Sequence, residues 1–252
     1  KKKNDLEDLV AENMQLEFGG RGQEPDVRRL VDMKEVIFDQ SWLAGAEDFE
    51  LYYMYRDLFL SRADKEKLLL QGLRYDITII PPNMLGCEHI KTAGHYHPLV
   101  PGGSITYPEL YEVLEGEAIY LLQSLGLSDV VAVYASAGDK VLVPPDYGHI
   151  TINRSNKTLK MANFVARNFS SLYDPFKEKA GGAYFFTRDG WIKNDRCPEA
   201  AELRRVQVPV SSSLRKLGLA KGREMYPLLR EKGLLDYLTK PEEHLELFEG
   251  II

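Results

Sequence analysis

Residues 109–122 read ELYEVLEGEAIYLL, with runs of largely apolar residues on either side of Gly116. Such short runs, rich in Leu, Val, Ile and Tyr, are typical of strands. A glycine between two glutamates at positions 115–117 predicts a tight turn. Upstream, residues 73–80 (LRYDITII) alternate between apolar and polar side chains and end at two prolines. These stretches predict a β-rich core.

Further strands are predicted over residues 49–60, 130–135, 140–143, 149–153 and 159–167. Short strands about ten residues apart, punctuated by Gly and Pro, favour a barrel or jelly roll. After about residue 190 the pattern changes. Residues 199–205 have a helical character, and residues 224–248 carry apolar side chains at steps of three and four. This spacing predicts a helical C-terminal extension.

The length, charge and composition of the chain argue against some classes of function. A chain of 252 residues suits one large domain, or one domain with an appendage. With 38 acidic and 32 basic residues, the net charge of −6 argues against a general binder of nucleic acids or membrane surfaces. An anionic small molecule is still compatible with a locally positive pocket. No apolar run approaches the roughly 20 residues that cross a bilayer, and the two distant cysteines fit a reducing, cytoplasmic location.

Three of the five histidines form a pattern. His95 and His97 would point to one face of a strand, because residues i and i+2 do so, and His149 follows 52 residues later. An HxH pair alone is more often an ordinary surface or core pair. Here Glu109 precedes Gly116 by seven residues. His95, His97, Glu109 and Gly116 thus form one spaced set of residues. Farther along the chain, Gly138, Pro144, His149 and Asn153 form a second set. Together the two sets resemble the paired motifs of the cupin superfamily, whose first motif supplies HxH and Glu and whose second supplies one His.

The first motif departs from the cupin pattern in two ways. His89 stands where a glycine is usual, and eleven residues rather than three or four separate His97 from Glu109. Glu112 is therefore an alternative ligand, although it would point to the opposite face of the strand. Glu109 keeps the usual distance to Gly116, so it is the preferred ligand.

More specific segments resemble the archaeal cupin-type phosphoglucose isomerases. Residues 92–97 (TAGHYH), followed by ELY at 109–111, are similar to that family's TxGHxH…ExY signature. Residues 28–33 (RRLVDM), 52–55 (YYMY), 75–78 (YDIT) and 143–149 (VPPDYGH) also fit, as does Tyr173 with Glu178-Lys179 after it. The resemblance covers roughly residues 25–190. It implies an all-β cupin barrel (double-stranded β-helix, jelly roll) over residues 1–190, with an N-terminal arm, and the helical extension over 191–252.

The resemblance also implies roles for individual residues. One divalent metal ion would be held by four side chains, His95, His97, Glu109 and His149. The sugar phosphate would contact Tyr52, Thr78, Thr92, Gly94 and Tyr173. Tyr111 would lie beside the reacting carbons, and Glu109 would also act as the base. A further histidine of the family aligns near Ser171, so this chain must do without it.

The implied reaction interconverts glucose 6-phosphate and fructose 6-phosphate in glycolysis and gluconeogenesis, through a cis-enediolate or through a metal-assisted hydride shift. Iron is the preferred ion, with nickel, zinc and manganese as alternatives, because three imidazoles and a carboxylate accept several ions. A homodimer is expected by analogy with other cupins. The alternatives are another metal cupin, such as a mannose-phosphate isomerase or an oxygenase, and a non-catalytic cupin that binds sugar phosphates. The C-terminal extension is expected to be accessory, so that deleting residues 200–252 would leave the site competent.

Overall fold

The computed structural model describes residues 14–208, 215 and 217–252. Its strands are β1 (Leu16–Phe18), β2 (Arg21–Gln23), β3 (Asp26–Arg29), β4 (Glu50–Tyr55), β5 (Leu73–Ile80), β6 (Met84–Leu85), β7 (Glu88–His89), β8 (Glu109–Glu115), β9 (Glu117–Ser124), β10 (Val130–Ser136), β11 (Lys140–Val143), β12 (Tyr147–Ile152), β13 (Leu159–Ala166), β14 (Tyr184–Thr187), β15 (Gly190–Lys193) and β16 (Leu203–Gln207). Its helices are short: η1 (Leu30–Met33), α2 (Gln40–Leu43), α3 (Arg62–Leu70), α4 (Asp174–Glu178), η2 (Tyr226–Arg230), η3 (Asp236–Leu238), η4 (Pro241–His244) and α6 (Leu245–Phe248).

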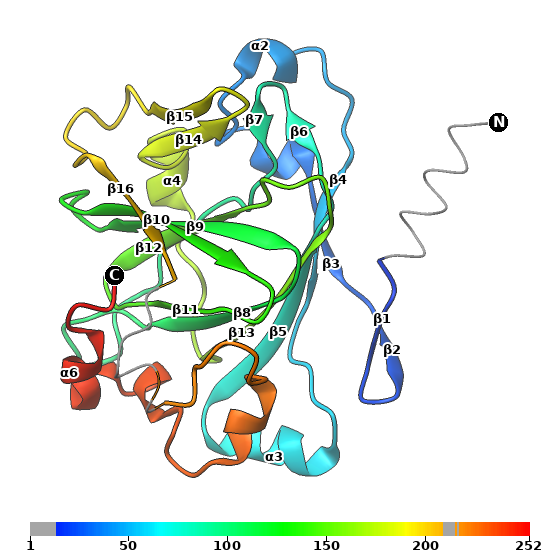
Figure 1. Cartoon of the computed structure of the whole chain (residues 1–252), viewed down its shortest axis with the longest axis vertical. Helices are drawn as coiled ribbons and strands as arrows, with labels where there is room; N and C mark the ends of the chain where they lie inside the picture. The colour runs from blue at the N-terminus through cyan, green and yellow to red at the C-terminus, as the bar shows by residue number, and fades with distance from the viewer. Residues whose placement is uncertain (1–13, 209–214, 216) are drawn as a thin grey trace.

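Two sheets face each other and form the barrel (Figure 1). One has six strands in the order β11-β8-β13-β5-β4-β3, and the other has four in the order β12-β9-β10-β16. All pairings within the six-stranded sheet are antiparallel, and β16 joins β10 in parallel. This arrangement confirms the predicted all-β cupin barrel.

Along β5, apolar and polar side chains alternate, so one face of the six-stranded sheet is apolar and the other lines the cavity. Leu73, Tyr75, Ile77 and Ile79 belong to an apolar cluster on the outer face of the sheet, whereas Thr78 faces the cavity of the barrel. The period of two places every second side chain on the same face. The polar residues of this strand therefore point into the barrel, where they can meet a ligand.

The turn at Gly116 has a different role from the one its sequence predicts. The chain reverses there, but β8 pairs with β11 and β13, whereas β9 pairs with β10 and β12. The turn thus carries the chain from one sheet to the other and does not close a hairpin. Gly116 has φ +83°, and a Cβ at this position would lie 2.6 Å from the carbonyl oxygen of Thr158. Only glycine fits this crossing without strain.

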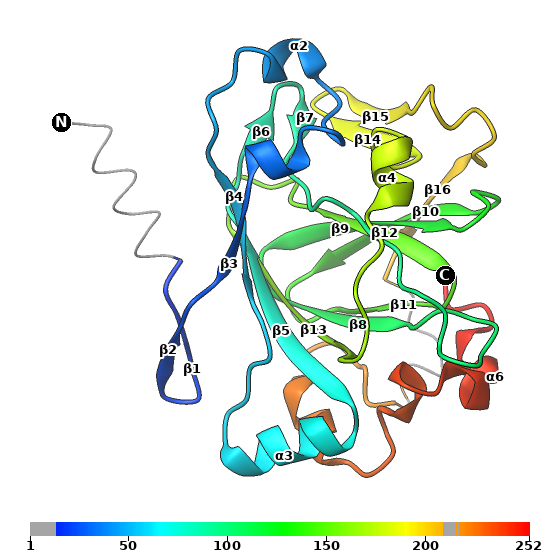
Figure 2. The same cartoon turned by 180° about the vertical axis from the view of Figure 1, so that it is seen from behind.

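The C-terminal residues cover the outer face of the six-stranded sheet. Helices are present over 224–248 as predicted, but they are mostly single 3₁₀ turns, η2 to η4, followed by the four-residue α6. The helix predicted over residues 199–205 is wrong, because β16 occupies residues 203–207 and extends the barrel sheet. Of these turns, η2 lies beside α3 at one end of the molecule (Figure 2), and the side chains of Leu228 and Leu229 in η2 and of Tyr237 in η3 are buried.

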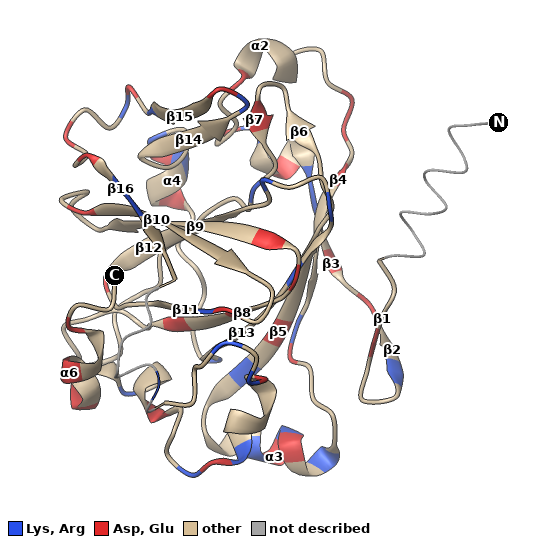
Figure 3. Ribbon diagram, viewed as in Figure 1, with Lys and Arg blue, Asp and Glu red and all other residues tan. Residues whose placement is uncertain are grey.

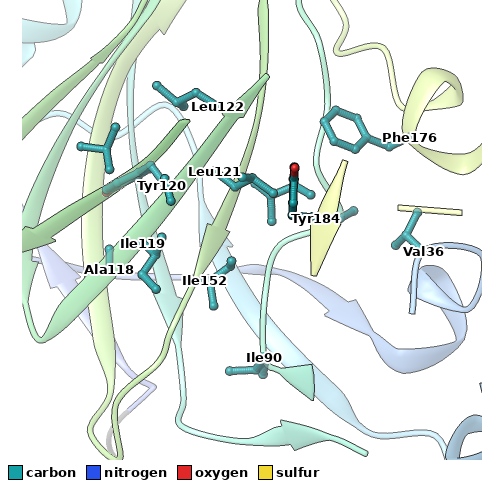
Figure 4. Packing of buried hydrophobic residues seen from close by; sticks show 14 of the residues in the cluster. Val36, Ile90, Ala118, Ile119, Tyr120, Leu121, Leu122, Ile152, Phe176 and Tyr184 are labelled. Carbon is teal, nitrogen blue, oxygen red and sulfur yellow. The ribbon is translucent and has the colours of Figure 1, made fainter. Parts of the chain in front are cut away.

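A second layer covers the four-stranded sheet. Figure 4 shows Leu121 of β9 next to Tyr184 of β14, with Phe176 of α4 and Val36 nearby, all within one apolar cluster. The opposite face of β9 points into the barrel, where the ring of Tyr120 packs against that of Tyr111 at 5.1 Å between centroids. Because β14 and β15 lie after the last predicted strand, this layer was not expected from the sequence.

No helix among the described residues is long and apolar enough to cross a membrane. Residues 1–13 of the predicted N-terminal arm lie outside the described part of the chain, and the rest of the arm forms the β1–β2 pair. The homodimer stays a prediction.

Candidate active site

The two predicted cupin motifs meet inside the barrel. His95 and His149 are directly paired through their backbones, with His95 N donating to His149 O and His149 N donating to His95 O at 3.3 and 3.1 Å. His97 follows two residues later, and Glu109 is the first residue of β8. The expected regular strand over the HxH pair is absent. Isolated bridges at residues 91, 95 and 96 hold that segment against β12 and residue 172 instead.

Four potential ligand atoms converge. Oε2 of Glu109 lies 3.2 Å from Nε2 of His97, 3.2 Å from Nε2 of His149 and 3.9 Å from Nε2 of His95. The ligand atoms of the four residues all lie within 4.8 Å of one another. Metal–ligand bonds of about 2.0–2.2 Å place neighbouring ligands about 3–4 Å apart, so the spacing suits a single ion.

The chemistry of these donors also fits a metal ion. Oε2 of Glu109 is buried and has no well-aligned hydrogen-bond partner among the described residues. A buried carboxylate oxygen without a donor is costly, and a cation would remove that cost. His97 Nδ1 lies 2.8 Å from the carbonyl oxygen of Tyr107. Since a carbonyl only accepts, Nδ1 donates there, which leaves Nε2 as the nitrogen that can bind a metal ion.

The pKa shifts of His95, His149 and Glu109 also fit a metal ion. Burial lowers the pKa of His95 well below its ordinary value, and the nearby His149 and His97 lower it further. Burial also lowers the pKa of His149, although Glu109 opposes the shift. Burial disfavours ionisation of Glu109, but its contacts with His149 and His97 outweigh this, so its pKa lies well below the ordinary value. The lowered pKa values favour neutral His95 and His149 beside an ionised Glu109, and these protonation states bind divalent metals.

Glu112, the alternative ligand, is on the other face of β8. Its carboxylate lies 2.9 Å from Nζ of Lys140 and accepts a hydrogen bond from the backbone N–H of Met225. It therefore attaches the C-terminal segment to the outer face of the sheet and is directed away from the imidazoles.

The cavity around these four side chains contains all of the residues that the resemblance implicates. Its lining comes from β4, β5, β8, β12, β13 and the segments 92–97 and 169–173. The ten residues predicted from the sequence are Tyr52, Thr78, Thr92, Gly94, His95, His97, Glu109, Tyr111, His149 and Tyr173. Their individual roles stay predictions. Ser171 lines the same cavity, at the position where the family's further histidine was expected.

Other polar residues at the cavity were missed. Arg56, Arg74, Asp76 and Asn163 also line it, and the guanidinium of Arg28 lies over the ring of Tyr173 at 5.5 Å. The alternation of β5 carried a usable signal, because Arg74 and Asp76 share the face of Thr78. Charged residues on the inner face of a barrel strand could have been identified as site candidates.

Comparison with known proteins identifies a family for the chain. The family model described as glucose-6-phosphate isomerase matches residues 27–201. A glucose-6-phosphate isomerase of Pyrococcus abyssi is 32% identical over 175 residues, which are 68% of this chain and 86% of the relative. A glucose-6-phosphate isomerase of Pyrococcus furiosus is 26% identical over 175 residues, which are again 68% of this chain and 86% of the relative.

Among solved structures, a recombinant oxalate oxidase in complex with glycolate matches with a TM-score of 0.33 and 17% identity. The match covers 42% of this chain and 47% of the oxidase. Oxalate decarboxylase from Bacillus subtilis matches with a TM-score of 0.34 and 15% identity, over 48% of this chain and 27% of the decarboxylase. The sequence matches are far more specific, and by them the chain belongs to the glucose-6-phosphate isomerase family.

Proposed function

We propose that this chain interconverts glucose 6-phosphate and fructose 6-phosphate, with one divalent metal ion bound by His95, His97, Glu109 and His149. The observation that carries the proposal is the convergence of these four side chains in one cavity, in a chain of this family. Iron is the proposed ion, and a borderline set of three imidazoles and one carboxylate also suits nickel, zinc or manganese.

The reaction moves one hydrogen between C1 and C2 of the open-chain sugar. A divalent ion at this site would polarise the carbonyl and stabilise negative charge on the substrate oxygens. On the enediolate route, the chain itself must supply a group that holds the proton between its two positions. Two carboxylates line the cavity, those of Asp76 and Glu109. The oxygens of Asp76 accept hydrogen bonds from the backbone of Asp57 and from Arg74, which leaves Glu109 as the proposed shuttle.

Tyr111 is proposed to steady the reacting oxygens. Its hydroxyl lies 3.0 Å from Nε2 of His149, next to the carboxylate of Glu109. Burial raises the pKa of Tyr111 well above its ordinary value, and the charge of Glu109 raises it further. The phenol therefore stays protonated at neutral pH and is available as a hydrogen-bond donor to a substrate oxygen.

The hydroxyl and amide donors predicted for the phosphate line the same cavity. Tyr52 accepts a hydrogen bond from the backbone of Ala93 at 3.2 Å, which fixes its hydroxyl beside the segment that carries the HxH pair. Gly94 has φ +79°, and a Cβ there would lie 2.6 Å from Ile150. A glycine is thus required at this position by its packing against Ile150.

Substituting Thr92 with valine is expected to raise the KM for fructose 6-phosphate while leaving the metal content unchanged. Loss of one hydrogen bond to a charged phosphate costs about 1.5–3 kcal/mol. The hydroxyl also accepts a hydrogen bond from the backbone N–H of Thr151 at 2.9 Å, so some loss of stability should accompany the change. Thr92→Ser keeps the hydroxyl and is the matched control. Steady-state kinetics and metal analysis of both variants test this role, and an unchanged KM in the valine variant would count against it.

The proposed function itself is tested with purified protein stripped of metal and reloaded with single ions. Conversion of glucose 6-phosphate should disappear with the metal and return with a suitable ion, iron first. Faster turnover of mannose 6-phosphate would identify a mannose-phosphate isomerase instead. Tight binding of sugar phosphate without turnover under any ion would favour a non-catalytic binding protein.

A further inference from the structure

Two arginines stand at the cavity and take no part in the function proposed above. Arg74 is the second residue of β5, and Arg56 directly follows the last residue of β4. Both line the cavity that contains the metal ligands. Their side chains are 25% and 36% exposed, so they are located at its rim, within reach of solvent and of an entering ligand.

A buried aspartate holds both guanidinium groups. Asp76 is 3% exposed, and its Oδ2 atom lies 2.8 Å from Nε of Arg74 and 3.8 Å from Nη1 of Arg56. Its Oδ1 atom accepts the backbone N–H of Asp57 at 2.9 Å. Each carboxylate oxygen is therefore engaged, and Asp76 acts as a fixed support for two cationic side chains.

The two guanidinium groups have donors to spare. A guanidinium carries five N–H groups, and Arg74 uses its Nε–H on Asp76, while its terminal N–H groups find no acceptor among the described residues. Arg56 donates through Nε to Asp26, whose side chain is 68% exposed, and an ion pair so open to water is weak. Its Nη2 group donates to the sulfur of Met54 at 3.1 Å, and a thioether is a weak acceptor. The rim thus presents cationic donors that have weak partners or none among the described residues, although acidic and basic residues are otherwise mixed over the described part of the chain (Figure 3).

The distances suit a phosphate whose sugar lies at the metal ligands. Glu109 is paired with Val165 on β13, and Val165 with Arg74 on β5. Two strand spacings of about 4.8 Å place the Arg74 backbone about 10 Å from that of Glu109. An extended hexose 6-phosphate spans about 8–9 Å from C1 to phosphorus, for C–C bonds of about 1.5 Å. A long arginine side chain therefore reaches the phosphate when C1 and C2 lie beside Glu109.

We propose that Arg56 and Arg74, held in place by Asp76, recognise the phosphate group of the substrate and select phosphorylated over neutral sugars. The inference rests on the proposed function, and it adds a cationic side to a phosphate subsite for which the sequence indicated only hydroxyl and amide donors. Guanidinium groups suit this task, because their planar fork donates two parallel hydrogen bonds to phosphate oxygens.

The test compares Arg74→Gln and Arg56→Gln with the wild type. Each variant should raise the KM for fructose 6-phosphate about tenfold or more, which is the effect of one lost hydrogen bond to a charged group. The kcat should change by less than about threefold, and the metal content should stay the same. Arg62→Gln is the matched control, because Arg62 is 92% exposed on α3 and pairs only with Glu66.

A second readout separates recognition from a structural role. Inhibition by glucitol 6-phosphate should weaken in both variants, whereas inhibition by glucitol should not. Equal weakening of both inhibitors, or an unchanged KM in both variants, would overturn the proposal. If Arg74→Gln does not fold, Arg56→Gln alone decides, because its side chain is the more exposed of the two.

Calorimetric titration with inorganic phosphate measures phosphate affinity without any turnover, so it tests the arginine subsite separately from the isomerase activity. The wild type should bind phosphate more tightly than either glutamine variant. If the wild type binds phosphate but converts no sugar phosphate, the proposed function fails while the arginine subsite survives. If it isomerises the substrate and phosphate binds equally to all three proteins, the subsite is wrong and the function stands.

Discussion

Replacing Glu109 with glutamine is expected to lower kcat by about 10²–10⁴-fold, the range over which a positioned acid–base group contributes. Glutamine cannot hold a proton between C1 and C2, and it also removes the single negative charge among the four ligands. Oε2 of Glu109 lies 3.2 Å from Nε2 of both His97 and His149, so metal affinity should fall as well. Kinetics must therefore be measured at saturating metal, with the bound ion counted in each preparation.

Glu112→Gln is the control on the same strand. This residue faces Lys140 and the backbone of Met225, so its variant should lose stability but keep the specific activity of the folded protein. Turnover in D₂O then separates the two routes. Deuterium should enter the product at the carbon that receives the hydrogen if Glu109 shuttles a proton, but not if a hydride shifts directly. A metal-loaded Glu109→Gln protein with full kcat would exclude the shuttle.

The four candidate metal ligands could be predicted because the pattern that identifies them is local in the sequence. His95 and His97 are two residues apart, and Glu109 and His149 have fixed distances to glycines that the turns require. The long insertion before Glu109 left Glu112 open, and side-chain alternation along β8 resolves the choice: Lys140 is paired with Glu112 in register on the neighbouring strand. The pairing of Lys140 with Glu112 joins segments that are distant in sequence, and the alternation of side chains along one strand cannot predict it.

The arginines at the rim were missed for a related reason. Strand β5 was identified with its full range and Thr78 was expected at the substrate, but how far along that face the cavity extends depends on β4 and β13, its neighbours in the sheet. For the C-terminal segment, the burial of side chains was predicted correctly but the form of the backbone was not. Apolar spacing correctly indicated buried side chains over 224–248, yet the segment forms separate turns shaped by the sheet they cover. Residues 203–207 form a strand because β10 offers them a free edge.

Deleting residues 200–252 is expected to leave a chain that does not fold stably at 25 °C. The deletion removes β16 from the barrel sheet and uncovers the outer face of the six-stranded sheet. The buried side chains that are lost include Leu228, Leu229, Leu235, Tyr237 and Leu238, each at most 2% exposed. At about 1.5–3 kcal/mol per side chain, their loss rivals the 5–15 kcal/mol that stabilises a typical domain. Circular dichroism and solubility of the truncated chain measure the outcome.

A point substitution separates stability from catalysis in the same segment. Leu229→Ala should lower the free energy of unfolding by about 2–5 kcal/mol, as expected for a fully buried leucine. Its KM and metal content should not change, because the residues lining the cavity all lie at or before Tyr173. Leu70→Ala, at an 89% exposed position on α3, is the matched control and should alter neither property. A stable truncated chain with full activity would show that the extension is accessory, as the sequence indicated, whereas a raised KM in Leu229→Ala at full stability would show that the C-terminal segment reaches the active site.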